Sequence, residues 1–322
     1  MADQTAGIEQ GGIKAFRKGP DLFRVLCWVA SAATVATLAW IIVEITHQSW
    51  PAIRESGLGF LFGDKWIPNR GIFGVLPFLI GTAVSSLIAL LFALPLGLAI
   101  AIFLSEDFLP LPIRQAIRFT VEMLAAIPSV VYGLWGIAVV IPLVQIFGSW
   151  AVVAFENIPV LNTLFAPPAY GNSMLTASLV LALMILPTIT AISRTALVAV
   201  PGTLREGAYA LGATRWEAIL GVIVPTAAPG IVAATILALG RAMGETMAIA
   251  MLIGNSSRLT SSLLAPAGTL AGLLANQFGE AEGMQVSSLM YAALLLVAMT
   301  LLVNMAGEFV LRYTQKRTAG IR

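Results

Sequence analysis

The sequence predicts an all-α integral membrane protein with six transmembrane helices. Hydrophobic residues make up 58% of the 322 residues, charged residues only 11%, and the mean hydropathy is +0.91. Soluble globular domains carry about 25% charged and about 45–50% apolar residues. Because so few polar side chains cannot cover a chain of this size in water, the composition excludes a water-soluble enzyme.

Six apolar stretches are long enough to cross a bilayer core, which needs about 20 residues of helix. The second and third are longer than this minimum, and prolines fall inside the second, third and fourth. We therefore expect kinked or tilted helices that pack against one another. The six expected spans are residues 25–46, 75–104, 119–147, 172–193, 227–253 and 286–311.

Lys and Arg in the connecting segments predict that both termini lie in the cytoplasm. With this orientation thirteen of the 18 basic residues lie inside, and four lie outside: Arg54, Lys65, Arg70 and Arg258. Cytoplasmic loops of membrane proteins carry the excess of Lys and Arg. The remaining basic residue, Arg241, falls within the fifth span.

The expected organisation has four parts around the spans. They are a cytoplasmic tail (1–24), a first transmembrane helix with an outer loop (25–74), a transmembrane core (75–311) and a second cytoplasmic tail (312–322). The net charge of +2 argues against a nucleic-acid partner. The chain has one cysteine, Cys27, and one histidine, His47, so neither a disulfide framework nor a clustered metal site is expected. We expect no catalytic residue, no metal and no cofactor.

The segment 201–225, between the fourth and fifth spans, is expected to form two short helices around a glycine. Thr203 and Glu206 have the spacing of a capping box, which places the start of the first helix. Gly212 is a suitable C-cap. The second helix has an apolar face made of Ala213, Trp216, Ile219 and Leu220. Such a segment either docks into a groove of a soluble partner or links two spans along the interface, and its residues alone favour neither.

The same segment resembles the EAA motif of binding-protein-dependent ABC importer permeases. In that motif E-A-A is followed by three residues, a glycine, nine residues and I-x-L-P. The matching positions are held by Glu206, Ala208, Gly212 and Pro225. The family's alanine, isoleucine and leucine are replaced by Gly207, Val222 and Val224. The resemblance implies that residues 201–225 are a coupling loop that inserts into a cytoplasmic ATPase subunit.

The chain itself has no G-x-x-x-x-G-K-[ST] phosphate loop. ATP hydrolysis is therefore expected on a separate subunit, and this chain is not expected to be an enzyme. An autonomous secondary transporter, driven by an ion gradient, is a less favoured alternative because such a carrier has no use for an ATPase-docking loop.

Three stretches, Gly240–Ala248, Ala126–Leu134 and Ala101–Glu106, resemble the PstC-type permeases of phosphate-specific ABC importers. The resemblance runs over residues 75–308 and implies a type I, MetI-like permease core in the bacterial cytoplasmic membrane. It also implies alternating access and three kinds of partner: a PstA-like second permease, a PstB-like ATPase dimer and a PstS-like periplasmic phosphate-binding protein. A permease for sulfate, molybdate or a phosphonate remains an alternative, because a local motif does not exclude a change of substrate.

Arg241 lies near the middle of the fifth apolar run, where an arginine costs about 2.5–3.5 kcal/mol on insertion scales. It should therefore face a pore or a partner, where its guanidinium would attract an oxyanion. Glu245 lies four residues later, on the same face of a continuous helix. Either Glu245 pairs with Arg241 and releases it during transport, or takes up a proton, or the two form a permanent structural ion pair.

Small residues surround these charges in the sequence. Ala234, Ala238 and Ala248 would share the face of Arg241 and leave it open. Gly240 and Gly244 have the G-x-x-x-G spacing that lets a second helix approach closely.

Two hydroxyl side chains flank Pro128 in the third span. Ser129 and Tyr132 would either offer their hydroxyls to an anion or bind the backbone carbonyls that the proline leaves without a donor.

Overall fold

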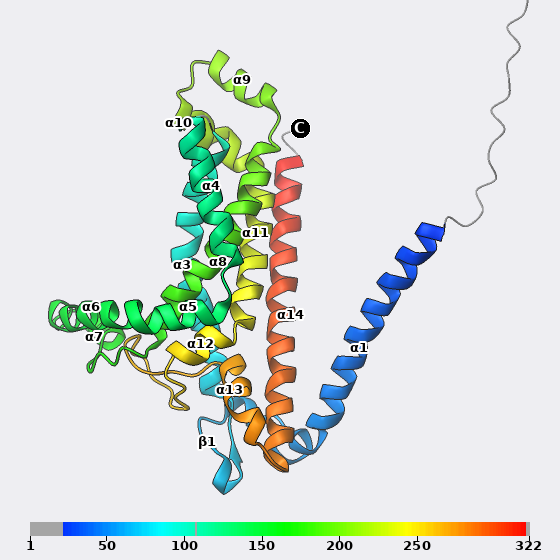
Figure 1. The fold of residues 1–322 in the computed structure, drawn as a ribbon, viewed down its shortest axis with the longest axis vertical. Coiled ribbons are helices and arrows are strands. Elements are labelled where there is room, and N and C mark those ends of the chain that lie inside the picture. The colour runs from blue at the N-terminus through cyan, green and yellow to red at the C-terminus, as the bar shows by residue number, and fades with distance from the viewer. Residues whose placement is uncertain (1–21, 107, 320–322) are drawn as a thin grey trace, which may run out of the picture. The chain divides into compact units, whose positions relative to one another are not determined.

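The computed structural model describes residues 22–106 and 108–319 (Figure 1). Residues 1–21 of the expected N-terminal tail and residues 320–322 of the C-terminal tail lie outside the described residues. The chain divides into two compact units, Met1–Glu44 and Ile45–Arg322. The two units are described separately.

The described part of the first unit belongs to helix α1 (Leu22–Ser56), which continues into the second unit. Every side chain of residues 22–44 is exposed. The hydroxyls of Ser31, Thr34 and Thr37 each donate to the carbonyl four residues earlier, at 2.8–3.0 Å. Their polar groups are thus satisfied within the helix, and the apolar surface that remains suits lipid or another protein.

Four long helices lie side by side in the second unit (Figure 1). They are α3 (Leu76–Ser105), α8 (Met174–Val198), α11 (Val224–Gly244) and α14 (Met284–Ala319). Helix α8 is central, since 72% of its apolar window is buried, against 22–33% for the other three long spans. The side chains that the other helices turn outward are largely apolar, as a membrane environment requires.

Six helical segments of the described residues are long and apolar enough to cross a membrane, which confirms the expected number. They are Leu22–Ser56, Leu76–Ser105, Ser129–Ala154, Met174–Val198, Arg215–Gly244 and Met284–Thr314.

The prediction of one helix over residues 119–147 was wrong, because the helix is interrupted at Pro128. Helix α4 (Leu111–Ala126) packs beside α3 and α8. A separate helix α5 (Ser129–Trp135) continues through the π-turn η2 (Gly136–Val140) into α6 (Ile141–Ala154). Figure 1 shows α5 and α6 running across the direction of α3 and α8. Ile127 is extended, with ψ 127°, because a residue that precedes proline avoids the helical conformation.

The fifth expected span also differs from the prediction of 227–253. The helical segment starts earlier, with α10 (Arg215–Ala218) and the π-turn η3 (Ile219–Ile223), and α11 ends at Gly244. Glu245 is extended, and the short helix α12 (Met247–Leu252) follows.

Short elements connect the long helices. An antiparallel pair, β1 (Trp66–Ile67) and β2 (Ile72–Phe73), aligns Trp66 with Phe73 and Ile67 with Ile72. Trp66 is buried in an aromatic cluster with Phe60 and Phe78. The other short helices are α2 (Gly59–Phe62), η1 (Pro68–Arg70), α7 (Pro159–Leu164), α13 (Leu270–Gln277) and η4 (Phe278–Glu280).

The coupling loop contains α9 (Gly202–Ala210) and α10, and it lies at the same end of the second unit as the C-terminal end of α14 (Figure 1). This arrangement agrees with the prediction that the two lie on one side of the membrane. That this side is the cytoplasm stays a prediction.

Candidate functional site

The first helix of the coupling loop starts differently from the prediction. Helix α9 begins at Gly202, directly after the extended Pro201, and no side chain caps it. The expected capping box of Thr203 and Glu206 is therefore wrong. The capping box of this loop is one helix later, where the Thr214 amide donates to the Glu217 carboxylate at 2.7 Å and the Glu217 amide donates to Thr214 Oγ1 at 3.4 Å.

The prediction for Gly212 is confirmed. Its φ of +83° lies in the left-handed region, which glycine adopts without steric cost. Two backbone hydrogen bonds close the end of α9: Gly212 N to Tyr209 O at 3.0 Å, and Ala213 N to Ala208 O at 3.1 Å. These are the two bonds of a Schellman motif, which fixes the angle between α9 and α10.

The coupling loop exposes three apolar side chains. Leu211 is 91% exposed, and Leu220 and Trp216 are 62% and 48% exposed. Ile219, expected on the same face, is buried instead. Of the EAA positions, Glu206, Gly212 and Pro225 are exposed and Ala208 is buried. Exposed apolar surface that is rimmed by polar residues is typical of a docking site.

Arg241 and Glu245 do not share a continuous helix. Because α11 ends at Gly244, Glu245 lies in the extended link before α12. Its Oε1 accepts a hydrogen bond from the Ala248 amide at 3.4 Å, which caps α12. No ion pair between Arg241 and Glu245 is found among the residues that the structure describes. The expectation that both residues lie on one face of a continuous helix was therefore wrong, because Gly244 favours a helix end and a carboxylate is stable at a helix start.

The small residues of α11 serve packing and do not open the face of Arg241. Ala234 and Ala238 are fully buried, whereas Arg241 is exposed. At Gly240 a Cβ would lie 3.3 Å from Asn304 Oδ1 on α14, so that glycine does permit the close approach of a second helix. Gly244 faces open space. The small residues thus bring α14 close to α11, and Arg241 is exposed among the described residues.

Tyr132 binds a backbone carbonyl. Its hydroxyl donates to Leu124 O at 2.9 Å, and its side chain is buried. Leu124 is four residues before Pro128, so its carbonyl is the one that loses a helical donor at the proline. The second alternative for Tyr132 is therefore the observed one. Ser129 is the first residue of α5 and is half-buried.

The structure brings three of the four expected pathway residues, Arg241, Glu245 and Tyr132, into one region. Tyr132 of α5 belongs to the same buried cluster as Ala242, the residue after Arg241, so the end of α11 lies near α5. Helix α12, capped by Glu245, packs on α5 so closely that a Cβ on Gly133 would lie 3.4 Å from the Ala248 Cα. An exposed guanidinium therefore lies where α11 breaks and α5 crosses.

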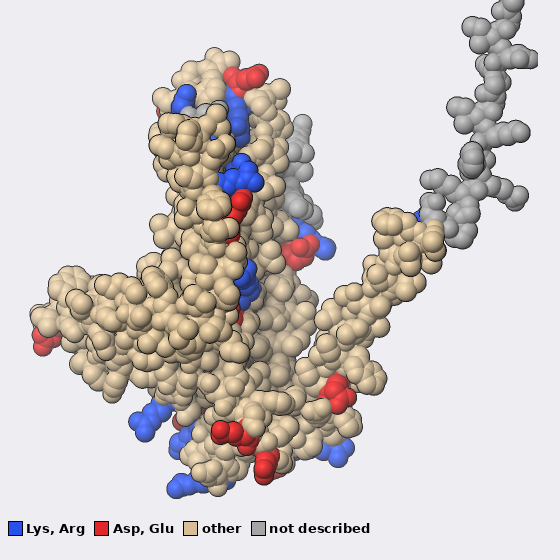
Figure 2. All heavy atoms as spheres, viewed as in Figure 1, with Lys and Arg blue, Asp and Glu red and all other residues tan. Residues whose placement is uncertain are grey.

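A cavity of about 270 Å³ lies beside this region. It is lined by Leu124, Ile127, Val131, Tyr132, Trp135 and Leu183. Because the lining is mainly apolar and the Tyr132 hydroxyl already donates to Leu124, this cavity does not suit an anion. Along α4, α8 and α11, the charged side chains that are visible in Figure 2 gather in one strip, and the rest of that face is tan.

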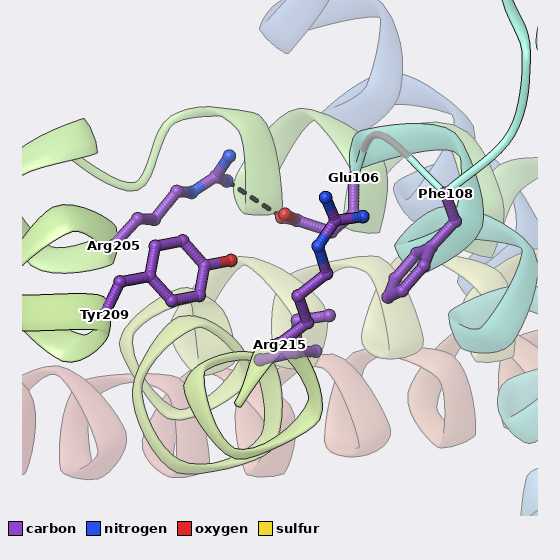
Figure 3. A pocket seen from close by; sticks show the side chains of 6 residues that line it. Glu106, Phe108, Arg205, Tyr209 and Arg215 are labelled. Atoms are coloured by element: carbon purple, nitrogen blue, oxygen red, sulfur yellow. Dashed lines mark ion pairs between the residues drawn. The ribbon is translucent and has the colours of Figure 1, made fainter. Parts of the chain in front are cut away.

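The sequence analysis missed a second cavity, which is polar, has a volume of about 240 Å³ and lies beside the coupling loop (Figure 3). Glu106, Arg205, Tyr209 and Arg215 contribute its polar groups, together with the apolar Phe108 and Ile219. Glu106 belongs to one of the stretches that carry the family resemblance, and the two arginines were counted only for topology. A carboxylate placed directly after a 30-residue apolar helix is the signal that could have identified the cavity.

Comparison with known proteins gives consistent results. Residues 93–320 match the family model for the binding-protein-dependent transport system inner membrane component. The phosphate transport system permease protein PstC of Mesorhizobium japonicum is 40% identical over 95% of this chain and 94% of its own length. The PstC protein of Haemophilus influenzae is 39% identical over 94% of this chain and 93% of its own.

Two solved structures have a similar fold. Both are inward facing conformations of the MetNI methionine ABC transporter. One matches with a TM-score of 0.52 and 22% identity over 77% of this chain and 96% of the other. The second matches with a TM-score of 0.51 and 21% identity over 75% of this chain and 94% of the other.

Proposed function

Because the chain belongs to the family of binding-protein-dependent transport system inner membrane components, we propose that it is the permease subunit of an ABC importer that carries inorganic phosphate into the cytoplasm. A member of this family is a multi-pass inner-membrane protein and a translocation component, not an enzyme. The observation that carries phosphate as the substrate is the 39–40% identity to phosphate transport permeases over nearly the whole chain.

An ABC permease works with ABC partners, and the proposal specifies them. A PstA-like permease completes the transmembrane part, a PstB-like ATPase dimer supplies energy, and a PstS-like protein delivers phosphate from the periplasm. The exposed apolar residues of the coupling loop support an ATPase-docking role, because Leu211 and Leu220 turn most of their side chains to the outside. The docking positions are Glu206, Ala208, Gly212 and Pro225.

Arg241 is the proposed attraction point for the anion in the membrane. Its guanidinium is exposed in a region of apolar helices, and a guanidinium binds two phosphate oxygens at once and does not deprotonate. Glu245, in the link after α11, and Ser129, at the start of α5, are assigned to the same proposed path. In the proposed cycle, ATP binding closes the ATPase dimer, the coupling loop moves, and the helices around Arg241 change their tilt.

The test is uptake of labelled phosphate by phosphate-starved cells that lack this chain, with and without its gene restored. Restoration should return uptake, and a large excess of unlabelled sulfate or phosphonate should leave that uptake unchanged. Full competition by sulfate or a phosphonate would replace phosphate by another oxyanion. Uptake that persists after the ATPase subunit is deleted would instead indicate a secondary transporter.

A further inference from the structure

Glu106 lies where a transmembrane helix meets the coupling loop. It follows α3 directly, in an extended conformation, and its side chain is only 11% exposed. Its Oε1 lies 3.1 Å from Arg205 Nη2 on α9. A carboxylate buried to this extent is costly unless a cation lies beside it, so the pair holds α9 near the end of α3.

Arg205 also connects α9 to the central helix. The same Nη2 donates to Leu197 O, in the last turn of α8, at 2.9 Å. Arg194 of α8 donates from Nε to Leu104 O of α3 at 3.4 Å. One guanidinium therefore connects the first coupling helix to the ends of two transmembrane helices.

The second coupling helix is attached to the same end of α3. Trp216 of α10 stacks on Phe108, with ring centroids 5.1 Å apart and an angle of 24°. It also meets Phe103 edge-on, at 6.3 Å and 82°. Both helices of the coupling loop thus contact α3 through side chains, although α3 is about 100 residues away along the chain.

The ion pair at Glu106 is incomplete. Glu106 Oε1 is within ion-pair distance of Arg205 Nη2 but forms no hydrogen bond with a described residue, and neither does the buried Arg205 Nε. Both residues line the 240 Å³ cavity. Figure 3 shows Arg205 and Arg215 reaching toward Glu106 from opposite sides. The carboxylate therefore lies between guanidiniums from the two coupling helices, one before and one after the Gly212 turn.

We infer that Glu106 is a positioning residue that transmits movement of the coupling loop to α3. It holds Arg205 of α9 beside the end of α3, so that movement of α9 reaches α3 through this ion pair. The inference rests on the proposed function, because the ATPase is what moves the loop.

The test measures phosphate uptake and ATP hydrolysis in proteoliposomes that contain the complete importer. In Glu106→Gln, phosphate transported per ATP hydrolysed should fall about tenfold, within the range of coupling between distant sites, while hydrolysis continues. Glu106→Asp keeps the charge and should recover most of the ratio. Glu308→Gln is the matched control, since Glu308 forms an exposed pair with Arg312 at the end of α14, and its ratio should equal that of the wild type.

The outcomes separate the inference from the function it rests on. If the wild-type importer takes up no phosphate, the proposed function fails. If the wild type transports phosphate and Glu106→Gln keeps the same ratio, Glu106 does not transmit movement. A parallel loss of assembled complex and of both activities, with the ratio unchanged, would show a role in folding only and would likewise overturn the inference.

Discussion

At the scale of single residues, Arg241 carries most of the proposed chemistry. A mid-span arginine is too costly to face lipid, and the Arg241 side chain is exposed among the described residues. Glu245, which the sequence analysis expected to lie beside Arg241, caps α12 instead. The guanidinium therefore has no carboxylate that would neutralise it within the described residues, which suits a site for an anion.

Arg241→Gln should abolish phosphate uptake while the importer still assembles, because an amide lacks the positive charge and the paired donors of a guanidinium. Uptake of labelled phosphate, with the amount of purified complex as a second readout, measures this. Arg312→Gln, at the exposed end of α14, is the matched control and should transport normally. Loss of assembly in Arg241→Gln would support a packing role and contradict the account.

Tyr132→Phe should lower stability and leave transport intact. The substitution removes the hydrogen bond to Leu124 O, which is worth about 0.5–1.5 kcal/mol. The melting temperature of the purified complex should fall, and the apparent KM for phosphate should stay the same. An unchanged melting temperature together with lost uptake would show that the hydroxyl contacts the anion.

Some of these residues could be read from the sequence and others could not. The exposure of Arg241 follows from the cost of a charge in lipid, which holds whatever the fold. The pairing with Glu245 was expected because the sequence G-R-A-M-G-E-T fits a continuous helix. The same sequence also fits a helix end, and tertiary packing decides between the two. The partners of Glu106 were missed because Arg205 lies about 100 residues later in the chain.

At the scale of elements, apolar stretches and glycine positions were sufficient for most of the fold. The number of spans and the turn at Gly212 appear as expected, since hydropathy and a positive φ are local properties. Pro128 could equally have kinked the third span. It breaks the span because Tyr132 satisfies the carbonyl that the proline orphans and lets α5 turn away from α4, which is a tertiary effect.

Gly212→Ala should weaken binding of the ATPase subunit. A Cβ has open space there, so the cost comes from the φ of +83° alone and is about 1 kcal/mol. Gly221→Ala is the matched control, because Gly221 is helical and also faces open space, and it should be neutral or slightly stabilising. Co-purification of the ATPase at increasing salt compares the two variants. Equal retention of the ATPase by both would contradict the role assigned to the turn.

At the scale of the whole molecule, each of the two units by itself presents much apolar surface. Residues 22–44 are exposed throughout, and only the central helix α8 is mostly buried. Arg241 is exposed among largely apolar helices, and the residues of the coupling loop reach α3 through Glu106 and Trp216. This distribution is what a permease requires: apolar sides for lipid and a second permease, one charged path, and one mechanical attachment for an ATPase.

The most direct test of this account is phosphate uptake by proteoliposomes that contain the complete importer, measured with ATP and with a non-hydrolysable analogue. The account predicts that labelled phosphate accumulates only with ATP and only when the ATPase and the binding protein are present, and that excess sulfate leaves the rate unchanged. Accumulation without ATP hydrolysis, or ATP-driven transport of sulfate in place of phosphate, would contradict it.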